Sequence, residues 1–230
     1  MIICVIPARG GSKGIPRKNI VRVGGKPLIA WTLEHALESR YINKVIVSTD
    51  CDEIAFACGH YGVTIHHRSP ETATDEATSE SAVREVLASR HDAELCVFLQ
   101  ATSPLRAPGD IDGAIELLRD QGLDSVFSGR RVEGYLWRTT TNPIIGMVPL
   151  HAQRVRRQDQ RIDNYEENGS IYVFRPEVLD RYHCRLGGTI GVYPMHPLDG
   201  YQIDEPEDIP LIESLMELRG SVDPVATARV

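Results

Sequence analysis

The sequence predicts an α/β protein whose β-sheet is mostly parallel. Short apolar runs with the length of buried strands alternate with segments whose apolar residues recur at helical spacing, which is the order of βαβ units. The chain has 230 residues, of which 42% are hydrophobic and 25% are charged. A chain of this length and composition can form a sizeable core and is too apolar to be intrinsically disordered. We therefore expect one domain over residues 1–220.

The first half of the chain carries the clearest alternation. Nearly continuous apolar runs predict buried parallel strands at residues 2–7, 44–48 and 95–99. Helical spacing of apolar residues predicts helices at residues 28–37, 54–61, 82–88 and 111–118. Right-handed βαβ connections place helices on both faces of such a sheet, and ligands then bind at the carboxyl ends of the strands. The loops after the strands are therefore the expected place for chemistry.

The alternation breaks after residues 125–129. Residues 130–161 contain seven arginines and two acidic residues, a net charge of +5, which leaves −12 for the rest of a chain whose net charge is −7. We expect an insertion over residues 130–168 that serves as a lid, an anion-binding loop or a subunit contact, with a solvated basic loop as the alternative. Regular structure returns with strands at 170–174 and 190–195 and helices at 177–182 and 209–218, before an expected disordered tail at 221–230.

Charge and cysteine usage exclude several classes of protein. With 25 basic and 32 acidic residues, the chain is a poor partner for nucleic acid or an anionic membrane surface. Its five cysteines are widely spaced and form no C-x-x-C pair, which favours a reducing, cytoplasmic compartment over a disulfide framework or a zinc site. The apolar start is too short for a membrane span and lacks the basic stretch of a signal peptide.

The loop after the first strand, residues 8–19, is suited to phosphate. It holds four cations, three glycines and no acidic residue. Glycine N–H groups can approach an anion closely, and Arg9, Lys13 and Lys18 can neutralise a triphosphate. The loop matches neither the Walker P-loop nor the dinucleotide fingerprint, so a turn without a ligand is the alternative.

Four motifs in one order resemble those of the acylneuraminate cytidylyltransferases, the CMP-sialic acid synthetase family. They are P-A-R-G-G-S-K-G-I-P-R-K-N at residues 7–19, R-S-P-E at 68–71 continuing through 75–79, L-Q-A-T-S-P-L-R at 99–106, and R-R-Q-D at 156–159 followed by E-N-G-S-I-Y at 167–172. The resemblance extends from residue 1 to about residue 218. It implies a Rossmann-like nucleotidyltransferase fold with an inserted dimerisation arm, CTP as co-substrate, Mg²⁺, and a homodimer.

The resemblance also implies roles for individual residues. The nucleotide would be held by Arg9, Gly10, Ser12, Lys13, Lys18, Asn19, Arg68 and Ser79. Of these, Lys18 and Arg9 would be catalytic, because they would stabilise charge at the reacting phosphate. The acceptor sugar would be bound by Gln100, Arg157 and Asn168, with Arg157 able to serve the other protomer and Asn168 alternatively forming only a turn.

The expected metal site departs from the family pattern. Relatives commonly carry D-x-D near the end, whereas this chain has Gln202 in the first position and Asp204 in the second. We expect Asp204 to be catalytic as the single carboxylate ligand of Mg²⁺, which usually completes its shell with phosphate and water. The acidic residues 204–208 alternatively form only a helix start.

The resulting prediction is an enzyme that transfers CMP from CTP to an acidic α-keto sugar of the sialic type and releases pyrophosphate. The acceptor stays open between this class, 3-deoxy-octulosonic acid and a phosphonate, because residues 185–188 differ from the sugar-lining residues of relatives. Two further alternatives are a nucleotidyltransferase that uses UTP or GTP, and a non-catalytic CTP-binding protein. No nucleic acid or membrane partner is expected.

Overall fold

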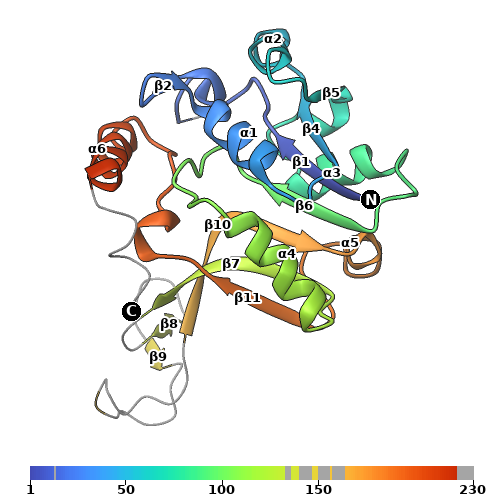
Figure 1. Cartoon of the computed structure of the whole chain (residues 1–230), viewed down its shortest axis with the longest axis vertical. Helices are drawn as coiled ribbons and strands as arrows, with labels where there is room; N and C mark the ends of the chain where they lie inside the picture. The colour runs from blue at the N-terminus through green and yellow to red at the C-terminus, as the bar shows by residue number, and fades with distance from the viewer. Residues whose placement is uncertain (13, 133–135, 140–146, 150–155, 157–163, 222–230) are drawn as a thin grey trace.

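A computed structural model describes the chain except for residues 13, 133–135, 140–146, 150–155, 157–163 and 222–230. Its centre is a seven-stranded sheet in the order β11-β7-β10-β6-β1-β4-β5 (Figure 1). The strands are β1 (Ile2–Pro7), β4 (Lys44–Thr49), β5 (Thr64–His67), β6 (Leu95–Leu99), β7 (Ser125–Val132), β10 (Asn164–Phe174) and β11 (Ile190–Pro194). Within this sheet β10 alone pairs antiparallel to its neighbours, which confirms the mostly parallel sheet.

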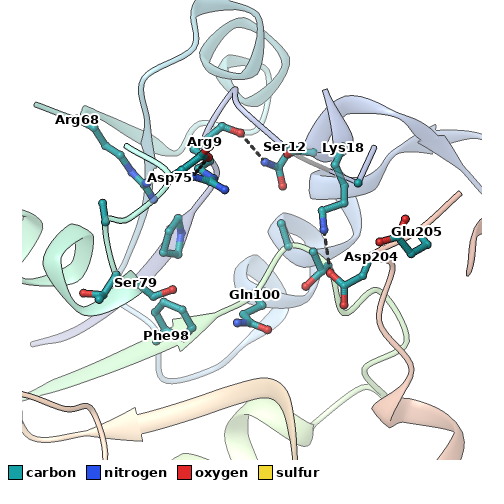
Figure 2. Close-up of a pocket in the computed structure, with 17 residues that line it drawn as sticks. Arg9, Ser12, Lys18, Arg68, Asp75, Ser79, Phe98, Gln100, Asp204 and Glu205 are labelled. Atoms are coloured by element: carbon teal, nitrogen blue, oxygen red, sulfur yellow. Dashed lines mark hydrogen bonds and ion pairs between the residues drawn. The ribbon is translucent and has the colours of Figure 1, made fainter. Parts of the chain in front are cut away.

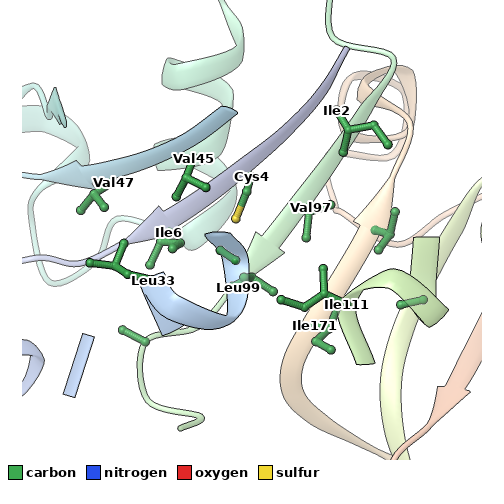
Figure 3. Close-up of a cluster of buried hydrophobic side chains, with 14 of the residues drawn as sticks. Ile2, Cys4, Ile6, Leu33, Val45, Val47, Val97, Leu99, Ile111 and Ile171 are labelled. Carbon is green, nitrogen blue, oxygen red and sulfur yellow. The ribbon is translucent and has the colours of Figure 1, made fainter. Parts of the chain in front are cut away.

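Helices cover both faces of the sheet, as the alternating pattern predicts. One face packs against α1 (Leu28–Glu38), α2 (Asp52–Gly59) and α4 (Asp110–Asp120), and the other against α3 (Ser79–Leu87) and α5 (Pro176–Tyr182). Strand β1 explains why the central strands are continuous apolar runs. Its Cys4 and Ile6 face the first layer (Figure 3), and its Ile3 and Val5 face the second, so that all four are fully buried.

A third cluster joins the two ends of the chain. Helix α6 (Asp208–Ser221) packs through Ile212 against Ile15 of the loop after β1 and against Ile203. The same cluster includes Val23 of the short hairpin formed by β2 (Arg22–Val23) and β3 (Lys26–Pro27). This packing holds residues 201–205 against the N-terminal loop, and it thereby brings two distant parts of the sequence to one edge of the sheet.

Strand β10 is longer than the strand predicted at 170–174, and its register is interrupted. Its first half pairs only with β7, from Asn164 opposite Val132 to Glu167 opposite Gly129. Pairing resumes at Tyr172, after an irregularity around Gly169, whose φ is +68°. The sequence does not predict this extension, because Asn164–Glu167 are partly or fully exposed and do not form the apolar run of a buried strand.

The segment expected to be an arm is described only in part. Besides the ends of β7 and β10, it contains the small hairpin of β8 (Trp137–Thr139) and β9 (Met147–Pro149). Most of its other residues, including Arg157, lie outside the described residues, as does the tail beyond residue 221. Within the described residues, no helix is both long and apolar enough to cross a bilayer. All five cysteines are free thiols.

Candidate functional site

A cavity of about 430 Å³ opens at the carboxyl ends of β1 and β6. Its walls come from the loop after β1, the segment before α3, the end of β6 and the segment before α6 (Figure 2). The predicted site residues that line it are Arg9, Ser12, Lys18, Asn19, Arg68, Ser79, Gln100 and Asp204. The fold thus gathers three of the four quoted motifs and the segment at residues 204–205 around one cavity, at the sheet edge where α/β proteins bind ligands.

Two cations that line this cavity form direct ion pairs with carboxylates that line it too. The Lys18 ammonium lies 2.9 Å from Oδ1 of Asp204, and Nη1 of Arg9 lies 2.7 Å from Oδ1 of Asp75. The Lys18 side chain is only 16% exposed, whereas that of Asp204 is 65% exposed. Asp204 can therefore turn toward solvent or a metal ion more easily than Lys18 can leave the wall.

The loop after β1 is held in shape by a hydrogen bond within it and by one to the residue after β4. Asn19 is buried, and its Nδ2 donates a hydrogen bond to the Arg9 carbonyl at 3.0 Å. The Gly10 amide donates to Oδ1 of Asp50 at 2.8 Å, and a Cβ at Gly10 would lie 2.9 Å from Cβ of Cys51. Gly10 therefore shapes the loop and does not line the cavity. The predicted Lys13 lies outside the described residues.

Arg68 and Ser79 lie at the end of the cavity away from Asp204 (Figure 2). Nε of Arg68 donates to Oγ of Ser48 at 3.0 Å, and burial lowers the pKa of its guanidinium. Ser79 begins α3, whose first turn is capped by Oγ1 of Thr78, which accepts a hydrogen bond from the Ser81 amide. The end of the cavity is therefore built on a capped helix start and a half-buried cation.

Gln100 lies where β6 ends, close to Gln202. Gln202 occupies the position where the family pattern leads us to expect the first carboxylate of the metal site. Oε1 of Gln202 accepts a hydrogen bond from Oγ1 of Thr102 at 3.2 Å, and its Nε2 donates to the Asn168 carbonyl at 2.5 Å. A carboxylate in place of this amide would set two acceptors against each other at Asn168. Gln202 thus bridges the loop after β6 and the irregular part of β10.

The predicted sugar contact Asn168 does not line the cavity. It is 5% exposed, and its Oδ1 accepts a hydrogen bond from Oγ of Ser128 at 2.6 Å. The same oxygen accepts one from the Ser170 amide at 3.2 Å. In this structure the carboxamide is hydrogen-bonded in the interior and supports the irregularity in β10, and a direct contact with the acceptor sugar stays a prediction.

The sequence analysis gave Arg106 and Asp75 no role, although both lie within the quoted motifs. Arg106 is 3% exposed and donates to Oγ1 of Thr32 and to the carbonyls of Ser103, Gln100 and Ser170 at 2.7–2.8 Å. Burial lowers its pKa to about 10, so it stays charged at neutral pH. It fixes the main chain of Gln100 from behind the cavity.

The acidic end of the cavity fits a magnesium ion held mainly by its substrate. Asp204 and Glu205 both line the cavity. Asp208 is directed elsewhere, because its Oδ2 accepts from the amides of Glu205 and Asp204 at 2.8 Å, and these bonds lower its pKa. Among the described residues no three His, Cys, Asp or Glu side chains form a metal-binding group. One or two exposed carboxylates are nonetheless what Mg²⁺ uses when phosphate oxygens complete its shell.

Comparisons with known proteins agree with this geometry. A family model described as "Cytidylyltransferase" matches residues 3–226. The N-acylneuraminate cytidylyltransferase of Escherichia coli is 41% identical over 220 residues, covering 94% of this chain and 52% of that protein. N-acylneuraminate cytidylyltransferase A of Danio rerio is 38% identical over 219 residues, covering 92% of this chain and 50% of that protein.

A solved structure shares the fold. The structure of CMP:2-keto-3-deoxy-manno-octonic acid synthetase complexed with CTP matches with a TM-score of 0.72 at 20% identity, covering 95% of this chain and 99% of that one. The chain spans about half the length of the two curated relatives described above. Its match to the family model over nearly all its residues shows that the chain belongs to the cytidylyltransferase family.

Proposed function

We propose that this chain transfers CMP from CTP to an acidic α-keto sugar of the sialic type and releases pyrophosphate. The observation that carries the proposal is the cavity at the ends of β1 and β6, which is lined by Arg9 and by the ion pair of Lys18 with the exposed carboxylate of Asp204. The names of the relatives supply the acceptor class, since both are N-acylneuraminate cytidylyltransferases.

The chemistry demands that two anions meet. The anomeric hydroxyl oxygen of the sugar would form a bond to the α-phosphorus of CTP, the bond from that phosphorus to the β-phosphate oxygen would break, and the hydroxyl would lose its proton. Pyrophosphate would leave with the electron pair. Catalysis of this kind depends on positioning and on cations near the developing charge. Arg9 and Lys18, with Lys13 from the same loop, would supply that positive charge, while Ser12 and the loop amides would position the phosphates.

Asp204, with Glu205 beside it, would hold a Mg²⁺ ion that supplies positive charge at the phosphate oxygens. The approach of phosphate to Lys18 would weaken the Lys18–Asp204 ion pair and make the carboxylate available. Arg68 and Ser79 would bind the cytidine end of the nucleotide. Gln100 would hydrogen-bond a hydroxyl of the acceptor, held there through its main chain by Arg106. Asn168 would act indirectly, because its carbonyl accepts a hydrogen bond from Gln202 and so holds that side chain beside Gln100.

We further propose that residues 130–168 form a dimerisation arm, that Arg157 reaches the acceptor site of a second copy, and that the enzyme works in the cytoplasm. The free thiols and the need for CTP support that compartment. The domain assignment of residues 1–220 is part of the same proposal.

A pyrophosphate-release assay tests the reaction. The protein is incubated with Mg²⁺ and each of CTP, UTP, GTP and ATP, together with N-acetylneuraminic acid, 3-deoxy-octulosonic acid or a phosphonate. We expect release with CTP and the sialic acid. Release with UTP or GTP alone, or tight CTP binding without turnover on any acceptor, would overturn the proposal in favour of another nucleotidyltransferase or a non-catalytic CTP-binding protein.

A pair of variants in one loop tests the site. Arg9→Gln removes a cation that lines the cavity, whereas Arg17→Gln removes one that is 69% exposed and pairs with Glu53 outside it. We expect kcat/KM for CTP to fall at least tenfold in Arg9→Gln and to change less than twofold in Arg17→Gln. Equal effects in both variants would mean that net charge matters and the cavity does not.

A further inference from the structure

Arg9 is joined to a carboxylate from another segment of the chain. Nη1 of Arg9 lies 2.7 Å from Oδ1 of Asp75 and also donates to the Thr74 carbonyl at 3.1 Å. Arg9 belongs to the loop after β1, and Asp75 belongs to the segment between the 3-10 helix η2 (Pro70–Thr72) and α3. Both side chains line the cavity and lie against each other in Figure 2.

The charges that line the cavity show how the Arg9–Asp75 ion pair would affect the binding of an anion. The described residues that line the cavity carry three cations, Arg9, Lys18 and Arg68, and three carboxylates, Asp75, Asp204 and Glu205. A triphosphate would add its negative charge next to these carboxylates. A metal ion would compensate Asp204 and Glu205 at one end of the cavity. Asp75 lies with Arg9 away from that end, so phosphates that approach Arg9 would also approach the negative charge of Asp75.

We propose that Asp75 is a displaceable counter-ion of Arg9, which a bound polyphosphate must replace. The proposal rests on the proposed function, because it concerns the anion that Arg9 binds. Nη1 has two hydrogens and already contacts both Asp75 and the Thr74 carbonyl, so a phosphate oxygen could bind it only by displacing one of them. Of the two, the carboxylate is the one that repels the phosphate. Asp75 therefore weakens nucleotide binding, and it speeds pyrophosphate release by returning to Arg9 as the product leaves.

The position of Asp75 in the chain extends this effect. Ala77, Thr78 and Ser79 follow it directly and line the same cavity. When the phosphates displace Asp75, the segment that leads to the cytidine end of the cavity loses one of its ties to the phosphate loop. Asp75 is accordingly a positioning residue, since it acts on the substrate through Arg9.

Two neutralising variants at adjacent positions isolate this effect. Asp75→Asn removes the counter-ion, and Glu76→Gln removes the same charge from a neighbour that is exposed and does not line the cavity. Dissociation constants are measured by titration calorimetry for CTP and for inorganic tripolyphosphate, with EDTA and without Mg²⁺. Because half-exposed ion pairs are weak, we expect Asp75→Asn to bind both anions about two- to fivefold more tightly than Glu76→Gln does. Inhibition by pyrophosphate should strengthen by a similar factor, and binding of uncharged cytidine should not change.

Equal affinities in the two variants would overturn the proposal, because they would show only a general effect of charge. Weaker binding by Asp75→Asn would overturn it too, by showing that Asp75 orients Arg9 for the anion and does not compete with it. The tripolyphosphate measurement keeps this test separate from the proposed function. If the unaltered protein turns over CTP and the variants bind alike, only the counter-ion role fails. If tripolyphosphate binding tightens in Asp75→Asn but no acceptor yields pyrophosphate, only the reaction fails.

Discussion

Replacing Gly169 by alanine is expected to lower the free energy of unfolding and to raise KM for the proposed acceptor. Gly169 has a φ of +68°, which is unfavourable for a residue with a Cβ. A Cβ built there would lie 2.1 Å from Nε2 of Gln202 and 2.7 Å from Oε1 of Gln100. Both side chains would have to move, and Gln202 would lose its bridge between loops.

Gly62 provides a matched control for the cost of a left-handed backbone conformation. Gly62 has the same φ of +68°, and no atom lies within 4 Å of its hypothetical Cβ. Gly62→Ala should lower the free energy of unfolding by about 1–2 kcal/mol, through left-handed strain alone. Gly169→Ala carries the same strain plus about 1–3 kcal/mol of overpacking, for a total of about 2–5 kcal/mol.

Urea denaturation followed by linear extrapolation measures both variants. In the pyrophosphate assay, KM for the acceptor should rise in Gly169→Ala and stay near the unaltered value in Gly62→Ala. Equal losses of stability in the two variants would refute the steric argument. An unchanged acceptor KM in a folded Gly169→Ala protein would refute the assignment of Gln100 to the acceptor.

Three further substitutions test the supports of the site. Gln202→Glu turns a donor toward the Asn168 carbonyl into an acceptor and should lower the free energy of unfolding by about 1–3 kcal/mol in urea titrations. Asn43→Asp is the control, because Asn43 is exposed just before β4 and its Oδ1 accepts from the Ile2 amide, a role that a carboxylate keeps. A smaller loss in Gln202→Glu than in Asn43→Asp would contradict the prediction. Arg106→Met leaves buried carbonyls unsatisfied and should lower the free energy of unfolding by about 3–5 kcal/mol. Arg119→Met, at the half-exposed pair with Glu94, should lower it by at most about 1 kcal/mol. Comparable losses in the two variants would refute the role of Arg106 in holding the main chain of Gln100. The folded-state pKa of Asp208 lies below its ordinary 3.8, so its stabilising effect is present above pH 3.8 and lost as the pH falls further. Asp208→Ala should therefore be less stable at pH 6 and approach the unaltered protein near pH 2, and parallel pH profiles would count against this.

The core of the fold could be predicted because it follows one simple pattern. Strands β1, β4 and β6 are buried on both faces and read as apolar runs, and the helices that cover them carry regular apolar spacing. Strand β5 was missed because its residues, Thr64–His67, are polar or partly exposed at the sheet edge. The first half of β10 was missed for a similar reason, since it pairs with β7 outside the core.

The candidate site could be predicted as a set of motifs but not as a set of contacts. The motifs identified most of the residues that line the cavity. They could not show that Asn168 turns inward, because that depends on Ser128 from a distant strand. Nor could they show that Asp75 pairs with Arg9, since the two lie on separate loops, far apart in the sequence. Long-range side-chain pairing is set by how loops meet at the sheet edge, and a single sequence carries no direct sign of it.

The most direct test of the account is a crystal structure of the protein with Mg²⁺ and a CTP analogue whose α,β-bridge resists cleavage. The account predicts phosphate oxygens within hydrogen-bond distance of Lys18 and Arg9, the metal ion on Asp204, and the cytosine beside Arg68 and Ser79. A nucleotide bound with its phosphates away from Lys18 and Arg9, or a metal ion that Asp204 does not touch, would contradict it.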